Sequence, residues 1–304
     1  MPQIRAQFPN NLKAGIDAIV GVSYDEFPLE YPKVFKIKSE KKRAFIEQSM
    51  RFGAPAAPVK IEGQAFDSFQ GGDAWTQRYN ILTLGYEFGL TEESLEDNLY
   101  EDLAIQLGRS GARGIREAEE ILCANVINYG FTAGTTAIGD GKALFATDHP
   151  LAGSGGTCSN VLATPADLSE SSLEDVLTLS RNAVDDQGLP VMIKPVRLVG
   201  TTALIYTGQR ILKSTGRTQT PDNDINAINS LGVFNEPMHV MTRITNPKTW
   251  FVLTNADYGF QFIDRIPLQK RQFQDDNGNH IVTLRRRCVP GVTDWRAGFS
   301  GGSL

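Results

Sequence analysis

A long, proline-free helical pattern over residues 91–129 constrains the fold more than any other feature of this chain. Its apolar residues recur at spacings of three and four, as they do on one face of an amphipathic helix. They are Leu95, Leu99, Leu103, Leu107, Ile115, Ala118, Leu122 and Val126. Thr91 is suited to cap the N-terminus, and Gly130 is suited to end the helix. At about 1.5 Å per residue the helix would be roughly 55 Å long, which exceeds the width of a small domain.

Three glycines, Gly108, Gly111 and Gly114, lie in the middle of this predicted helix. Glycine weakens a helix by about 1 kcal/mol relative to alanine, so three of them need a structural reason. One reason is a bend or break in the helix, and the other is the close approach of another backbone. We expect the bend.

Charge is distributed unevenly along the first part of the chain. Residues 36–51 are basic, whereas residues 87–102 hold seven acidic residues and neither lysine nor arginine. The acidic stretch is either a solvated helix face or a surface that meets the basic stretch of a neighbouring copy. The candidate interface residues are Lys41, Lys42, Glu92, Glu93 and Glu96.

The segments on either side of the helix differ in character. Residues 1–35 have little periodicity and are expected to form an extended arm. Residues 36–90 combine a Gly/Pro-rich stretch with strand-like alternation, and such a long excursion is uncommon inside a compact domain. After a Gly/Thr/Ser-rich stretch, residues 165–216 alternate helix, strand and helix. Near the end, strands at 269–275 and 280–287 flank Asn277-Gly278, which is a strong hairpin signal.

Composition excludes several classes of protein. The net charge of −5 argues against a generally basic protein that coats nucleic acid. No apolar run approaches the ~18 residues of a membrane helix, and the first residues lack the pattern of a signal peptide. Three widely spaced cysteines do not suggest a disulfide scaffold. We therefore expect synthesis in the cytoplasm, reduced thiols and no membrane contact.

The sequence offers no good catalytic, cofactor-binding or metal-binding site. None of the three histidines has another histidine or a cysteine near it, so no local zinc motif can be written. Asp148-His149 could form half of an acid–base pair, although a turn before Pro150 explains these residues more simply. We expect a protein that is not an enzyme and needs no cofactor.

Several segments together resemble one known family, and the resemblance spans roughly residues 35–300. The segments are 78–88, 89–100, 140–151, 159–169, 210–214, 222–228 and 293–299. In this order they are similar to the major capsid (head) proteins of tailed bacteriophages, in the branch of the Mu major head subunit. The resemblance implies an α+β fold of the Hong Kong 97 type. It also implies how the chain is organised. An N-terminal arm at 1–35 is followed by an extended β loop with flanking strands at 36–90, and then by a peripheral domain at 91–160 with a spine helix at 91–129. An axial domain follows at 161–245, and residues 246–304 return to the peripheral domain with a hairpin at 269–287 and a C-terminal strand.

The resemblance further implies a structural subunit of an icosahedral phage head, which assembles into hexamers and pentamers around double-stranded DNA. The implied partners are other copies of the chain, a portal protein, the packaged DNA in non-specific contact, and a cement or decoration protein. Because the arm and extended loop account for the length before the helix, we expect a separate scaffolding protein, or none, and a retained N-terminus. The implied location is the virion, after synthesis in the host cytoplasm.

Further interface candidates follow from the same resemblance. Asp222 and Asn223 lie in a polar loop of the implied axial domain. Lys60 on the extended loop, with Asn277 or Asn279 at the hairpin tip, has the positions of a lysine–asparagine cross-link known in the family. That cross-link needs a glutamate as its base, and the chain has none after Glu236, so we expect a non-covalent shell.

Two other functions remain open at this point. A nanocompartment shell protein would share the fold and enclose a protein cargo instead of a genome. A hydrolase would use Asp148, His149 and a distant carboxylate, and is the more distant alternative.

Overall fold

The structure is a computed structural model of the 304-residue chain. It describes residues 28–40, 42–91, 93, 100–132, 134, 138–216 and 224–302. Five of the candidate interface residues, Lys41, Glu92, Glu96, Asp222 and Asn223, lie outside these described residues.

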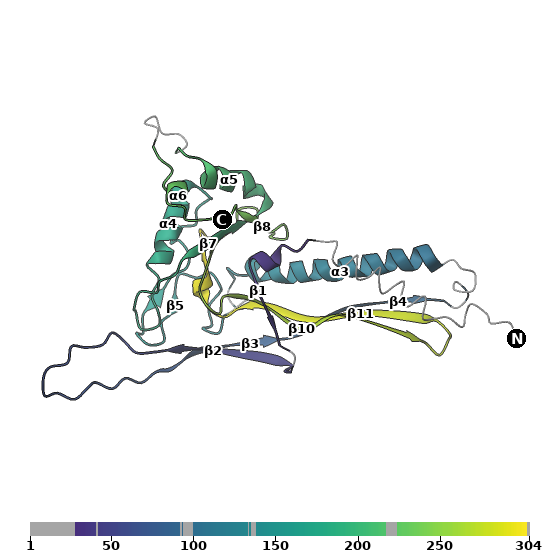
Figure 1. Cartoon of the computed structure of the whole chain (residues 1–304), viewed down its shortest axis with the longest axis horizontal. Helices are drawn as coiled ribbons and strands as arrows, with labels where there is room; N and C mark the ends of the chain where they lie inside the picture. The colour runs from purple at the N-terminus through teal and green to yellow at the C-terminus, as the bar shows by residue number, and fades with distance from the viewer. Residues whose placement is uncertain are drawn as a thin grey trace.

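One long helix lies along a four-stranded sheet and gives the molecule its elongated part (Figure 1). The helix is α3 (Tyr100–Asn128), and the predicted residues at its start, 92 and 94–99, lie outside the described residues. The sheet has the strand order β1-β10-β11-β4. Its strands are β1 (Lys36–Ser39), β4 (Leu82–Leu90), β10 (Phe260–Gln274) and β11 (His280–Val292).

The predicted hairpin is confirmed, and it is longer than the sequence indicated. Strands β10 and β11 pair antiparallel from Phe260 opposite Val292 to Gln274 opposite His280. Gly278 has φ 84°, a left-handed backbone conformation that glycine adopts without strain. The Asn-Gly signal therefore identified the turn correctly.

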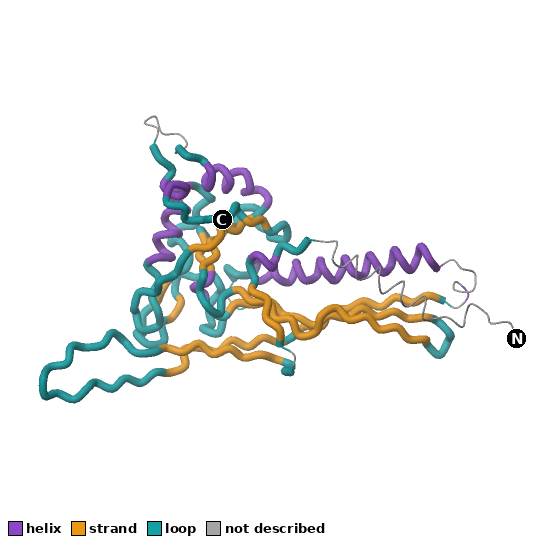
Figure 2. Tube along the Cα trace, in the orientation of Figure 1, coloured by secondary structure: helices purple, strands orange, loops and turns teal. Residues whose placement is uncertain are grey.

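A second antiparallel pair of strands carries a loop that projects from the body in the direction opposite to the tip of the β10–β11 hairpin (Figures 1 and 2). It consists of β2 (Phe45–Phe52) and β3 (Gly72–Asn80), which the loop 53–71 joins. Strands β1 and β4, which flank this ribbon in the sequence, belong to the main sheet instead.

A second four-stranded sheet, with the order β12-β9-β7-β8, lies beside three short helices. Its strands are β7 (Pro195–Gly200), β8 (His239–Val240), β9 (Trp250–Thr254) and β12 (Gly298–Ser300). The helices are α4 (Glu170–Arg181), α5 (Ile205–Lys213) and α6 (Ala227–Ser230). Two-residue strands β5 (His149–Pro150) and β6 (Thr157–Cys158) form a separate pair. Short 3-10 turns lie at Tyr31–Lys33, Thr202–Leu204 and Trp295–Ala297.

The resemblance implied that residues 246–304 return to the peripheral domain. Strands β9 and β12 of this segment lie in the second sheet, where β9 pairs with β7 and β12 pairs with β9. The physical reason is burial: Trp250, Phe251 and Val252 are fully buried, as a central strand requires. Residues 246–304 therefore contribute to both sheets.

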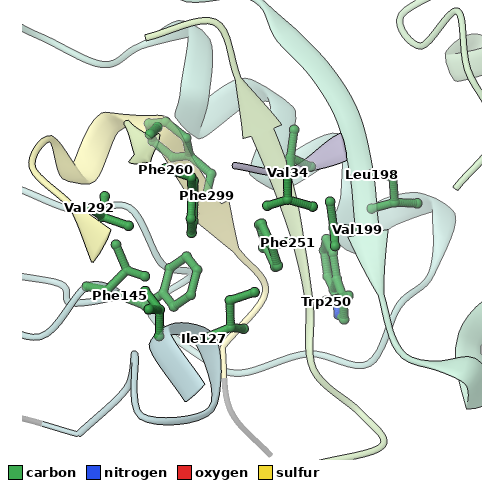
Figure 3. Packing of buried hydrophobic residues seen from close by; sticks show 14 of the residues in the cluster. Val34, Ile127, Phe145, Leu198, Val199, Trp250, Phe251, Phe260, Val292 and Phe299 are labelled. Atoms are coloured by element: carbon green, nitrogen blue, oxygen red, sulfur yellow. The ribbon is translucent and has the colours of Figure 1, made fainter. Parts of the chain in front are cut away.

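A single aromatic-rich core joins the two sheets (Figure 3). The rings of Phe251 and Phe260 lie 5.6 Å apart, and Phe145 lies 5.7 Å from Phe251. The end of the predicted arm enters the same core, because Tyr31 and Phe35 are each only 1% exposed. The described part of the arm is thus anchored within its own chain.

The expected bend in the long helix is wrong. Helix α3 is continuous through its glycines, and Figure 1 shows it running straight. A Cβ added at Gly111 would lie 2.8 Å from a methyl carbon of Leu284, and one at Gly114 would lie 2.9 Å from the ring of Tyr86. These two glycines allow the helix to approach β4 and β11 closely, which is the alternative that the sequence left open.

Candidate assembly surfaces

The loop 53–71 exposes four large apolar side chains, and exposed apolar surface that gathers in one place often marks an interaction site. Val59 is 92% exposed, Ile61 64%, Phe66 83% and Phe69 61%. The ammonium group of Lys60 lies 4.5 Å from the centroid of the Phe66 ring, which is a cation–π contact. The loop is therefore a strong candidate for an intermolecular contact.

The structure does not bring Lys60 close to Asn277 or Asn279 within one chain. The loop 53–71 and the hairpin tip at 275–279 lie at opposite ends of the molecule (Figures 1 and 2). The tip is held by a backbone hydrogen bond from Asp275 N to Asn279 O at 2.9 Å. Any contact between these two segments requires a second copy.

The oppositely charged stretches also stay apart within the described residues. Lys42 and Glu93 are both exposed, and no ion pair joins 36–51 to 87–102 in the part of the chain that the structure describes. The side chains of Lys42 and Glu93 are therefore open to contact with a neighbouring copy.

A polar cluster that the sequence did not reveal anchors the end of the arm. The Glu30 backbone N–H donates to Oε1 of Glu120 on α3 at 2.5 Å, and the Thr242 N–H donates to Oε2 of Glu30 at 2.8 Å. Arg243 donates to both Glu30 and Glu117. Burial raises the pKa of Glu120, whereas the hydrogen bond from Arg243 lowers the pKa of Glu117. The residues of this cluster that bond to one another lie about ninety or more positions apart in the sequence, so no local sequence pattern predicts the cluster.

Asp148 and His149 do not form a reactive pair. Asp148 pairs with Lys142, which lowers the pKa of that carboxyl group. His149 is fully buried: its Nδ1 lies 2.7 Å from Oδ2 of Asp140, and its ring stacks on Trp295 with centroids 4.8 Å apart. A substrate cannot reach this histidine, so its role is structural.

The described residues contain no group of three or more His, Cys, Asp or Glu that could hold a metal ion. No described helix has a stretch that is both long and apolar enough to span a bilayer.

Cys123 and Cys288 are buried free thiols. Burial raises the pKa of both thiol groups, and it raises the pKa of Cys288 to about 12. A thiolate, the reactive form of cysteine, is therefore disfavoured at both positions.

Comparisons with known proteins agree with this geometry. The sequence model of a family described as "Phage capsid protein" matches residues 74–300. No curated protein sequence matches the chain.

Solved structures of shells share the fold at low sequence identity. A virus-like particle from Pyrococcus furiosus is 10% identical, with a TM-score of 0.53 over 94% of this chain and 98% of that one. The procapsid of bacteriophage JBD30 is 13% identical, with a TM-score of 0.52 over 99% of this chain and 76% of that one. The SrpI encapsulin from Synechococcus elongatus PCC 7942 is 9% identical, with a TM-score of 0.50 over 91% and 88%. These matches confirm the expected α+β capsid fold. Because the family model covers most of this chain, the chain belongs to the phage capsid protein family.

Proposed function

We propose that this capsid protein is the major subunit of an icosahedral tailed-phage head, within the branch of the Mu major head subunit. Copies form hexamers and pentamers that enclose double-stranded DNA, and closed symmetry reuses the same patches at every contact. The family match over residues 74–300 supports a capsid role.

The single observation that carries the assembly role is the loop 53–71. It projects from the body and exposes four large apolar side chains that no described part of the same chain covers. Burying such side chains against another subunit contributes roughly 25 cal/mol per Å² of apolar area. The loop is therefore stabilised mainly by a neighbour.

Electron microscopy of particles purified from producing cells tests this function. We expect closed icosahedral shells in which this chain is the most abundant protein by mass spectrometry. Nuclease treatment followed by extraction should release protected duplex DNA. Shells that hold one protein cargo and no DNA would establish the nanocompartment alternative, which the fold shared with the SrpI encapsulin keeps open.

We also propose the partners that a phage head requires: a portal protein, a separate scaffolding protein and, on the outer surface, a cement or decoration protein. Contact with the packaged DNA is non-specific. Co-purification of these proteins with the particles at successive stages of assembly tests each partner separately.

The basic stretch 36–51 provides a second contact by docking on the acidic stretch 87–102 of a neighbour. Reversing Lys41 and Lys42 to Glu should reduce particle yield while leaving the subunit folded. Each exposed pair contributes only ~0.2–1 kcal/mol, but every subunit in the shell loses the same contact. A normal particle yield from the double variant would reject this docking.

A further inference from the structure

The ribbon formed by β2 and β3 turns one face to the body of the molecule and the other to solvent. Side chains alternate along a strand, so three cross-strand pairs share the body face. They are Ile46 with Tyr79, Gln48 with Gln77 and Met50 with Trp75. On the opposite face the side chains of β2 are exposed. A polar pair therefore lies between two apolar pairs in the seam that joins the ribbon to the body.

Gln48 is bonded to the body at the middle of this seam. Its Nε2 donates to Oε1 of Gln261 at 2.8 Å, and Nε2 of Gln261 donates back to Oε1 of Gln48 at 3.0 Å. Gln261 lies on β10 and is 1% exposed. The Thr293 hydroxyl donates to the same Gln48 oxygen at 2.8 Å. These hydrogen bonds come from two partners, so they hold the Gln48 amide in one position and one orientation.

Tyr79 connects the second strand of the ribbon to the same network. Its hydroxyl is hydrogen-bonded to Oγ1 of Thr293, and because Thr293 gives its own hydrogen to Gln48, the tyrosine is the donor. Burial raises the pKa of Tyr79, so its hydroxyl keeps the hydrogen that it donates. Nε1 of Trp75 donates to the backbone oxygen of Thr293 at 3.1 Å. Both strands are therefore bonded to one point of the body.

The position that receives Tyr79 is shaped for it. A Cβ added at Gly291 on β11 would lie 2.2 Å from Cε1 of the Tyr79 ring, so any larger residue there would displace the ring. Ile263 and Val289 pack beside it. Such apolar contacts are non-directional, whereas hydrogen bonds weaken steeply when their angles change. The polar network is therefore the part of the seam that resists a change of angle.

The angle of the ribbon decides where the loop 53–71 lies, because the loop continues directly from both strands (Figure 2). Ile81 alone separates β3 from β4 of the main sheet, and a few residues at the end of an element are enough to absorb a large change in direction. At the other end of the ribbon, the Gln187 side chain donates to the Gly53 oxygen at 3.0 Å, an exposed contact. A ribbon released from the network would therefore present its loop at more than one angle.

We propose that this network is a latch that fixes the angle of the ribbon and so sets the direction in which the loop meets a neighbouring copy. Its members are Gln48, Gln261, Thr293 and Tyr79. They are positioning residues for assembly, because contact between two different patches closes only when the rotation between copies is right. A single ribbon angle gives a single rotation and hence shells of one size. This inference rests on the proposed shell function for its consequence, whereas the latch itself is a property of one subunit.

Replacing the amide pair by an apolar pair of similar length tests the latch. Gln48→Met/Gln261→Met leaves neither amide buried without its partner, so the midpoint of urea unfolding should stay close to that of the wild type. The ribbon should nevertheless pivot. Spin labels at Arg51→Cys, near the outer end of the ribbon, and at Asp175→Cys on α4 report its position in a Cys158→Ser chain, and both label sites are exposed. The spread of label–label distances should widen about twofold or more, because the freed ribbon samples several angles.

Matched variants separate the latch from a general effect on the ribbon. Ser49→Ala/Thr76→Ala removes a hydrogen-bonded pair from the exposed face of the same ribbon and should leave the distances narrow. Thr293→Val removes the hydroxyl that joins Tyr79 to Gln48 and should widen them, whereas Thr293→Ser, which keeps the hydroxyl, should not. The Thr293 variants decide the question if the methionine pair does not fold.

Electron microscopy of the particles tests the consequence for assembly. The fraction of shells with the wild-type diameter should fall about twofold or more in the methionine pair and in Thr293→Val, because several rotations between copies then compete. It should stay unchanged in Ser49→Ala/Thr76→Ala and in Thr293→Ser.

The outcomes separate this inference from the proposed function. If the wild type forms no shells, the proposed function fails, and the distance measurement on the subunit still decides the latch. Distances that stay narrow in the methionine pair and in Thr293→Val would overturn the latch. Wide distances with shells of one unchanged diameter would show that neighbours set the ribbon angle, and they would overturn the inference as well.

Discussion

Arg286 on β11 and Glu119 on α3 form an ion pair in the interior, with Nε of the arginine 2.6 Å from Oε1 of the glutamate. The two side chains are 8% and 0% exposed. Arg286 also lies 3.6 Å from Asp264 on β10, and the Tyr31 hydroxyl donates to Glu119 at 3.3 Å. One buried cluster therefore connects the long helix, the hairpin and the end of the arm.

Removing one member of this pair should destabilise the subunit strongly. Arg286→Met leaves the Glu119 carboxylate buried without its cation, which typically costs about 3–5 kcal/mol. Urea unfolding of the unassembled subunit, followed by circular dichroism, measures the change in the free energy of unfolding. The double variant Arg286→Met/Glu119→Leu should recover most of the loss, since buried pairs are often replaced by apolar residues without net cost. A double variant as unstable as the single one would contradict this account.

The two glycines of α3 should respond differently to alanine. Gly111→Ala should lower stability, because Leu284 is 1% exposed and overpacking costs about 1–3 kcal/mol. Gly114→Ala should not, because Tyr86 is 53% exposed and its ring can move aside while the helix gains about 1 kcal/mol. The same unfolding measurement compares the two variants, and equal effects at both positions would show that packing does not distinguish them.

Local sequence patterns predicted the helices and strands of this fold better than the contacts between them. The apolar spacing from Leu103 to Val126 and the Asn277-Gly278 turn identified the long helix and the hairpin, because both depend on neighbouring residues. The contact of Gly111 with Leu284 and the bond between Glu30 and Glu120 join distant residues, and no periodicity encodes them.

The arm cluster should make stability depend on pH through Glu120. Burial raises the pKa of this carboxyl group above its usual value of 4.5, so the folded state favours the protonated form. Its ionised form therefore costs stability at neutral pH, and that cost disappears as the pH falls through the raised pKa. Glu120→Gln should be more stable than the wild type at pH 7, and the difference should shrink as the pH approaches 4.5.

Glu117 provides the control because its shift has the opposite sign. Arg243 lowers its pKa below 4.5, so its contribution is present above 4.5 and is lost as the pH falls through the lowered value. Glu117→Gln should reduce stability at pH 7, with the loss vanishing at low pH. Thermal unfolding between pH 3 and 7 distinguishes the two patterns, and variants that shift in parallel would exclude this explanation.

The shell should contain no covalent links between subunits, although the resemblance to capsid proteins makes Lys60 and the asparagines at the hairpin tip candidates for one. An amide is a poor acyl donor, and the amine must lose a proton before it can attack. Attack at a useful rate needs a positioned base. No glutamate follows Glu236. Asp294 cannot substitute, because it is buried and accepts hydrogen bonds from the Arg296 backbone and side chain.

Two carboxylates beside the tip do not change this expectation. Asp275 and Asp276 are exposed, so water solvates them and no enclosed site holds either one against an incoming amine. Particles boiled in detergent with reductant should therefore run as a single band near 33.3 kDa. Lys60→Arg, which keeps the charge and removes the amine, should give the same band and the same particle yield. A ladder of multimers in the wild type that disappears in Lys60→Arg would show that a cross-link forms and that another base serves it.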